Sequence, residues 1–187
     1  AVYGLRIGDY KAVDVDGDGR YIDLNDKQFI GYEEPRYRIG LRNDVSFLRD
    51  FNVSLFIRAD LGHLGRYTPI FQGSSEFDRF SMGGKPYPYW MPENRNNEYP
   101  RLDANVTTGA YGGGIRVYKP LSFVRIQDLS LSYSLPAALA QRFRMDSFRA
   151  FASVRNLYSF DNWPGWDPES RMAAMPRTFS LGFSLSL

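Results

Sequence analysis

The sequence predicts an all-β fold, a segment of an antiparallel transmembrane β-barrel with long loops, and three observations lead to this prediction. Apolar and polar residues alternate over runs of about eleven residues, which is the period of a strand with one apolar and one polar face. These runs are longer than a typical soluble strand of about 5–6 residues. Short and long connections alternate between the runs, as they do on the two sides of a membrane barrel.

The first two runs, 37–47 and 51–61, are joined by the polar turn Leu48-Arg49-Asp50 and predict an antiparallel hairpin. Apolar side chains occupy one side of each run: Tyr37, Ile39, Leu41, Val45 and Phe47, then Phe51, Val53, Leu55, Ile57, Ala59 and Leu61. Arginines fall on the opposite, polar side, and in a barrel they would line a wet interior together with those of the later runs: Arg38, Arg42, Arg58, Arg149 and Arg155.

Three further strands are predicted at 123–135, 148–158 and 177–187, with a short helix at 137–143 after Pro136. Phe151 is an aromatic exception on the polar side of its run. The last run alternates most cleanly, with Phe179, Leu181, Phe183 and Leu185 toward lipid and Thr178, Ser180, Ser184 and Ser186 toward the lumen. Eleven residues tilted by about 40° rise roughly 28 Å, close to the apolar band of about 25 Å around an outer-membrane barrel.

The whole chain, 1–187, is interpreted as one barrel segment with four parts. They are an Asp-rich extracellular loop at 1–35, the hairpin at 36–61, a long extracellular loop at 62–120, and the final three strands at 121–187. A loop as long as 62–120 is unusual in a compact soluble domain but usual outside a membrane barrel. Aromatic residues near the strand ends predict two interfacial girdles: Phe47, Phe51, Tyr133 and Phe148 at the short turns, and Tyr158, Phe160, Trp163 and Trp166 at the long loops.

The composition excludes several functions. The chain has no cysteine and one histidine, so thiol chemistry and His-based metal cages are excluded. A net charge of +2, from 23 basic and 21 acidic residues, gives no reason to expect nucleic acid as a partner. No nucleophile with a base, no acid pair and no phosphate-binding loop is recognisable, so we predict no catalytic residue and no enzyme.

The sharpest local motif is Asp14-Val15-Asp16-Gly17-Asp18-Gly19, which resembles the start of an EF-hand loop. Several carboxylates can converge there around a turn that glycine permits, and such hard oxygen ligands suit Ca²⁺. One residue inserted near Tyr21 would bring two later aspartates into ligand register. The predicted structural calcium ligands are Asp14, Asp16, Asp18, Asp23 and Asp26. The alternative is an Asp-Gly turn that binds no metal.

A series of motifs, in order along the chain, carries a family resemblance. The motifs are Gly8-Asp9-Tyr10-Lys11, the Asp-rich loop, Phe51-Asn52-Val53-Ser54-Leu55, Tyr99-Pro100-Arg101, Val124-Arg125-Ile126-Gln127-Asp128-Leu129-Ser130-Leu131, Arg155-Asn156-Leu157-Tyr158, Gly165-Trp166-Asp167-Pro168-Glu169, and the last strand with Gly182, Leu185 and Leu187. In this order the chain resembles the C-terminal part of TonB-dependent outer-membrane transporters of the SusC/RagA type from Bacteroidetes.

The resemblance implies a barrel of about 22 strands with a plugged lumen, of which this chain supplies about the last five. It implies import of glycans or peptides across the outer membrane, energy from TonB through an N-terminal part absent from this chain, and a SusD-type surface lipoprotein as partner. Because five strands cannot close a barrel, we expect a barrel-and-plug chain to supply the rest. A nicked transporter and a natural split are equally open.

Two other readings compete with the transporter segment. A secreted calcium-binding β-sandwich, used for carbohydrate binding or adhesion, would explain the Asp-rich loop and the aromatic residues. It explains the long strands and the alternating connections poorly. A surface hydrolase lacks an identifiable nucleophile or acid pair.

Overall fold

The computed structural model describes residues 6–10, 13–19, 25–67, 88–101, 117–171 and 173–187. The chain divides into two compact units, one formed by Ala1–Ile30 and Arg66–Tyr118 and the other by Gly31–Gly65 and Lys119–Leu187. Strands β3 (Leu64–Arg66) and β4 (Tyr118–Pro120) pair in a two-stranded sheet.

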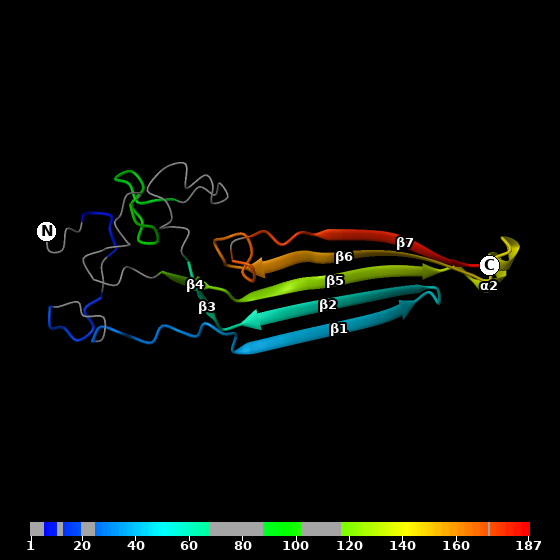
Figure 1. Cartoon of the computed structure of the whole chain (residues 1–187), viewed down its shortest axis with the longest axis horizontal. Helices are drawn as coiled ribbons and strands as arrows, with labels where there is room; N and C mark the ends of the chain where they lie inside the picture. Colours follow the sequence, from blue (N-terminus) through cyan, green and yellow to red (C-terminus); the bar gives the residue numbers. More distant parts are fainter. Residues whose placement is uncertain (1–5, 11–12, 20–24, 68–87, 102–116, 172) are drawn as a thin grey trace. The chain divides into compact units, whose positions relative to one another are not determined.

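The second unit is built on one antiparallel sheet of five strands in the order β1-β2-β5-β6-β7 (Figure 1). The strands are β1 (Tyr37–Phe47), β2 (Phe51–Leu61), β5 (Phe123–Ser134), β6 (Ser147–Asp161) and β7 (Thr178–Ser186), and helix α2 (Ala137–Arg142) joins β5 to β6. The predicted antiparallel all-β class is therefore confirmed. All five predicted long strands and the short helix lie within a few residues of their predicted bounds. We call the end with the β1–β2 turn and α2 the turn end, and the opposite end the loop end.

The short strand β3 was not predicted, because three residues are too few to show alternation. Its neighbourhood is organised by packing instead. A Cβ at Gly65 would collide with the side chain of Leu121, which is 1% exposed, and the Leu121 amide donates to the His63 carbonyl at 3.0 Å. Glycine is needed here because a buried leucine occupies the space of its missing side chain.

The sheet keeps its two faces distinct across an irregularity in β5. Its register against both neighbouring strands shifts around Gln127, so that Ile126 pairs with Ile57 and Asp128 pairs with Phe56. The β-bulge places Ile126 and Leu129 on the same face, although three positions separate them in sequence. On the β6 side, Asn156 adopts a left-handed φ of 53°, which asparagine tolerates better than most residues. Strand β6 then continues to Asp161, three residues beyond its predicted end.

One face of the sheet is apolar on every strand and is largely exposed. Cross-strand pairs such as Leu41–Ile57 and Ala152–Leu181 follow each other over this face. Leu181 is 86% exposed and Phe179 is 74% exposed. Within the part of the chain that the structure describes, no second layer covers these side chains, so this face differs from the buried side of a soluble sandwich.

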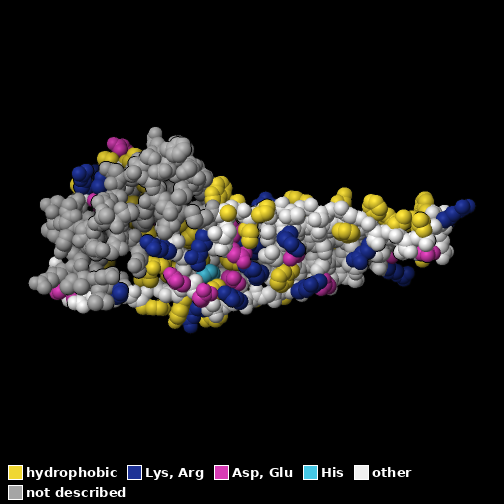
Figure 2. Space-filling model, viewed as in Figure 1, with side chains coloured by type: hydrophobic (Ala, Val, Ile, Leu, Met, Phe, Trp, Pro, Cys, Tyr) yellow, Lys and Arg dark blue, Asp and Glu magenta, His cyan; other side chains and the backbone are white. Residues whose placement is uncertain are grey.

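The opposite face carries charged and small polar side chains. Figure 2 shows Lys, Arg, Asp and Glu gathered on one face toward the loop end of the sheet. Two phenylalanines on this face lie over glycines. A Cβ at Gly182 would be 2.5 Å from the Phe151 ring, and one at Gly40 would be 3.4 Å from Phe56. The aromatic exception at Phe151 is thus explained, since its ring fills the space left by the glycine opposite it in the register.

Aromatic rings gather at the turn end, as the sequence predicts. The Phe47 and Phe51 rings stack at 5.4 Å between centroids, and the Phe51 and Tyr133 rings lie 4.7 Å apart. No helix among the described residues is long and apolar enough to cross a membrane.

Candidate functional site

The first candidate site is the Asp-rich loop of the first unit. Asp14, Asp16 and Asp18 each offer a carboxylate oxygen, and these oxygens lie within 4.8 Å of one another. Asp14 also accepts from the amides of Gly17 at 2.7 Å and Gly19 at 2.9 Å, which shapes the tight turn that the two glycines allow at φ of 76° and 74°. The turn therefore brings three of the predicted ligands close together.

Of the two further predicted ligands, Asp26 and Asp23, the structure describes only Asp26. Asp26 lies beside the loop, because its Oδ1 accepts from the Val15 amide at 2.8 Å. Asp23 lies outside the described residues. The Asp18 amide donates to Asp16 and favours its ionised form, but desolvation and the charges of Asp18, Asp26 and Asp14 outweigh this, and the pKa of Asp16 is raised. Mutual repulsion of this kind is what a bound cation would relieve.

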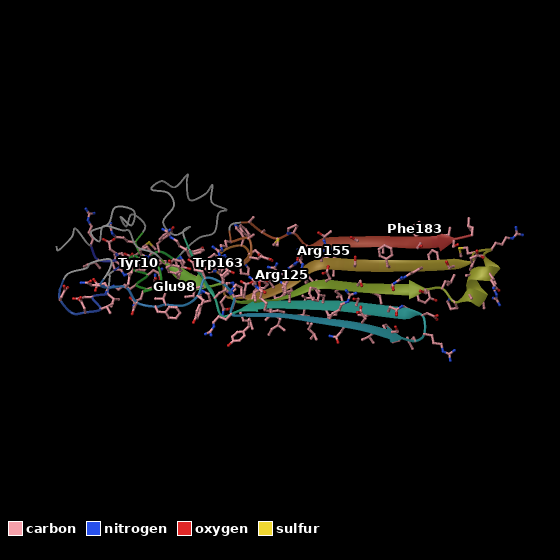
Figure 3. The ribbon with its side chains drawn as sticks, turned by 60° about the horizontal axis from the view of Figure 1, so that its bottom comes forward. Tyr10, Glu98, Arg125, Arg155, Trp163 and Phe183 are labelled. Carbon is pink, nitrogen blue, oxygen red and sulfur yellow. The ribbon has the colours of Figure 1, made fainter. Side chains whose placement is uncertain are left out.

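Contacts between distant segments anchor the chain just before this loop. Asp9 accepts from Arg101 at 2.5 Å. The Tyr10 hydroxyl donates to the Glu98 carbonyl at 2.5 Å, and Figure 3 labels these two residues close to each other. Burial, with smaller contributions from Tyr99 and Glu98, raises the pKa of Tyr10 to about 12. Residues 8–10 are thus held against 98–101, four positions before the first predicted ligand.

The second candidate site is a cross-strand row on the polar face near the loop end. The register aligns Gly40, Arg58, Arg125 and Ser159 across β1, β2, β5 and β6. Both guanidinium groups contact the ring of buried Phe123, with Arg125 at 4.8 Å and Arg58 at 5.2 Å from its centroid. One aromatic ring therefore holds two adjacent positive charges in fixed places.

Acidic residues from the connection after β6 neutralise this pair of arginines. Arg125 donates to Asp167 at 2.6 Å and to Glu169 at 2.8 Å, while Arg58 contacts the other Glu169 oxygen at 2.6 Å. The Arg125 side chain is 1% exposed and that of Asp167 is 8% exposed, whereas Glu169 is 37% exposed and Arg58 is 30% exposed. Glu169 thus bridges both arginines, and Asp167 binds only the buried one.

The segment 163–171, which we call the strap, folds back over the polar face. Asp167 accepts from the amides of Glu169 at 2.9 Å and Ser170 at 3.2 Å, and the Trp163 indole donates to the Arg171 carbonyl at 3.3 Å. Figure 3 shows Trp163 and Arg125 toward the loop end and Phe183 toward the turn end. The prediction that Trp163 belongs to an exposed girdle is wrong. It is 6% exposed, because its ring closes the strap against Gly165.

The other arginines predicted to lie on the polar face form weaker, exposed contacts. Arg38 pairs with Glu34, Arg42 with Asp44 and Arg155 with Asp128, all with side chains about half exposed or more. Arg149 donates to Ser132 at 2.9 Å.

The central role of Arg125 is not predictable from the sequence. Its motif and that of the strap lie about forty residues apart, and the spacing does not indicate their contact. The only sequence signal was an arginine in an otherwise apolar start of a strand.

Comparison with known proteins shows what this chain is similar to. No family model matches it. It is 29% identical over 161 residues to "TonB-dependent receptor P3" of Formosa agariphila, covering 84% of this chain and 15% of that protein. It is 24% identical over 173 residues to "TonB-dependent receptor P39" of the same organism, covering 88% of this chain and 16% of that protein. These matches confirm the predicted resemblance to TonB-dependent transporters.

The fold is similar to part of the solved RagAB peptide transporter, with a TM-score of 0.51, 19% identity, and coverage of 74% of this chain and 16% of that one. The RagAB importer in its closed-closed state gives the same TM-score. The chain spans about a sixth of the length of the proteins it matches. Its relatives are receptors and transporters, which agrees with the expectation of a non-enzyme.

Proposed function

We propose that this chain forms part of the wall of an outer-membrane, TonB-dependent importer of glycans or peptides. The observation that carries the proposal is the five-stranded sheet with one exposed apolar face and one charged face. A surface with Leu181 86% exposed and Phe179 74% exposed is costly in water at about 25 cal/mol per Å² of apolar area. Lipid against the apolar face and water against the charged face would remove this cost and keep the charged side chains hydrated.

The open sheet also supports a larger wall. Strands β1 and β7 are the outer members of the strand order, and among the described residues each pairs on one side only. Unpaired backbone groups in lipid are prohibitive, so the proposed wall needs the remaining strands of the same transporter, here about 22 in total with a plug inside. The loops at 1–35 and 62–120 would lie outside the cell, where a SusD-type lipoprotein would act as the lid. TonB would act through another part of the transporter.

The apolar face argues against the alternative of a secreted β-sandwich. A sandwich buries the inner faces of two sheets against each other. Among the described residues, the only long strands form one sheet, and its apolar face is open. A soluble sandwich would therefore need a second layer that the described part of the chain does not supply.

We also propose that Asp14, Asp16, Asp18 and Asp26, with Asp23 from outside the described residues, hold a structural Ca²⁺. The support is the convergence of three carboxylates within 4.8 Å, the position of Asp26 beside them, and an oxygen-only donor set. Bound calcium would fix the loop next to the anchored residues 8–10 and supply no chemistry.

The proposed function is tested by locating and extracting the protein that contains this sequence. Outer-membrane fractions should retain it after carbonate washing, and detergent should be required to release it. A cysteine placed at Leu181 should react with a lipid-soluble maleimide and not with a membrane-impermeant one. A cysteine at Ser180 is the matched control, since it points to the opposite face and should show the reverse preference if the lumen is wet. Equal labelling of both positions by the impermeant reagent would refute the membrane wall.

A further inference from the structure

The two arginines of the row are neutralised unevenly. Arg125 has a buried carboxylate of its own, Asp167 at 2.6 Å. Arg58 pairs with Asp60 only at 3.9 Å, and its short contact is with Glu169 at 2.6 Å. The closest counter-charge of Arg58 therefore comes from the strap.

We propose that Glu169 is an internal stand-in for a carboxylate of the cargo, and that Arg58 and Arg125 form an exchangeable carboxylate site. The proposal rests on the proposed import function and names the chemistry of the cargo. A carboxylate of a uronic acid or of an acidic peptide would replace Glu169 between the two guanidinium groups. The strap would stay tied to the wall by Asp167.

The contact geometry supports a site built for one carboxylate. Each oxygen of Glu169 faces a different arginine, at 2.6 Å to Arg58 and 2.8 Å to Arg125. Two planar guanidinium groups arranged around one carboxylate form directional, charge-assisted hydrogen bonds. Such bonds distinguish carboxylate binding from general electrostatic attraction. The Phe123 ring fixes both forks beforehand, so a ligand need not order them.

Burial separates the exchangeable acid from the permanent one. Asp167 is 8% exposed and accepts two amide bonds within the strap, so its release would leave a buried charge unpaired. Glu169 is 37% exposed and has the two arginines as its side-chain partners. Replacing Glu169 by another carboxylate keeps the row neutral, whereas replacing Asp167 would disrupt the fold of the strap.

The site has a hydrogen-bond donor that is not used and a hollow beside it. The Arg58 Nε is buried, and no partner for it exists within the part of the chain that the structure describes. A hollow of about 500 Å³ lies beside it, lined in part by Phe56, Arg58, Asp60 and Glu169. A cargo carboxylate next to a second oxygen, as on a sugar ring or a peptide backbone, could occupy this donor as well.

The experiment measures binding of carboxylate probes to the full transporter in detergent. The probes are an oligogalacturonate, its methyl ester, a glutamate-rich peptide and its glutamine counterpart. Glu169→Gln removes the competing charge while keeping shape, so we expect the acidic probe to bind about tenfold more tightly than to wild type. Arg58→Gln should abolish this gain, and Arg58→Lys should restore part of it because the charge returns without the fork.

Arg155→Gln is the matched control, since Arg155 lies on the same face in an exposed pair with Asp128 and should leave probe binding unchanged. The two acidic probes distinguish a glycan from a peptide source. The inference is overturned if Glu169→Gln binds acidic probes no more tightly than wild type, or if ester and acid bind equally. A protein that fails the lipid-labelling test fails the proposed function instead, so the two failures are distinguishable.

Discussion

Replacing Arg125 by glutamine should free the strap without destroying the sheet. The substitution leaves Asp167 buried at 8% exposure without its counter-charge and removes one of the two arginines around Glu169. Loss of one partner of a buried ion pair costs about 3–5 kcal/mol. The lower part of this range applies here, because Asp167 keeps its two amide bonds to Glu169 and Ser170.

Trypsin cleavage after Arg171 measures this opening. Arg171 is the last residue of the strap, and its carbonyl closes the segment by accepting a hydrogen bond from the Trp163 indole. When opening is fast compared with cleavage, the cleavage rate follows the open population. A loss of 3 kcal/mol raises that population roughly 100-fold, at about 1.4 kcal/mol for each factor of ten. Arg155→Gln breaks an exposed pair worth about 0.2–1 kcal/mol and should change cleavage less than about fivefold. Equal cleavage rates of the two variants would refute the claim that the buried Arg125–Asp167 pair holds the strap closed.

Three further outcomes follow from the packing, the acidic loop and the one histidine. Gly182→Leu should lower the unfolding temperature of the sheet, since its Cβ would lie 2.5 Å from the Phe151 ring and overpacking costs about 1–3 kcal/mol; Phe151→Ala in the same protein should recover most of the loss. Asp14→Asn should weaken calcium binding in titration calorimetry by more than about tenfold, and an unchanged affinity of this variant would remove Asp14 from the proposed ligands. Because the pKa of Asp16 is raised, the calcium affinity of the wild-type protein should begin to fall at a pH above the ordinary aspartate range. Burial lowers the pKa of His63, so the folded state keeps it neutral and stability is lost as pH falls below about 6.5; His63→Gln should abolish that part of the pH dependence in denaturation curves.

The strands were predictable because a sheet with two unlike faces repeats its pattern at every second residue. The pattern at 37–47 and 51–61 gives the observed bounds of β1 and β2. The bulge at Gln127 was not predictable, because a shift in register is decided by both neighbouring strands. Strand β3 was missed for a similar reason, since it is held by the packing of Leu121 on Gly65.

Of the two candidate sites, one is predictable from the sequence and the other is not. The acidic loop is local in sequence, so its convergence could be predicted from the spacing of Asp14, Asp16 and Asp18. The arginine row joins Arg58, Arg125 and Glu169, which are far apart in the chain and meet only through strand register and the fold of the strap. A single sequence shows charged residues on the polar face but not which of them are buried together.

The most direct test of the membrane-wall account is the heat-modifiability of the detergent-extracted protein, followed with an antibody against residues of this sequence. The account predicts that the unboiled sample migrates as a compact, SDS-resistant species of transporter size together with the barrel-and-plug part, and that boiling unfolds it and shifts its mobility. A chain that is soluble without detergent and migrates as a small monomer, with the same mobility before and after boiling, would contradict the account.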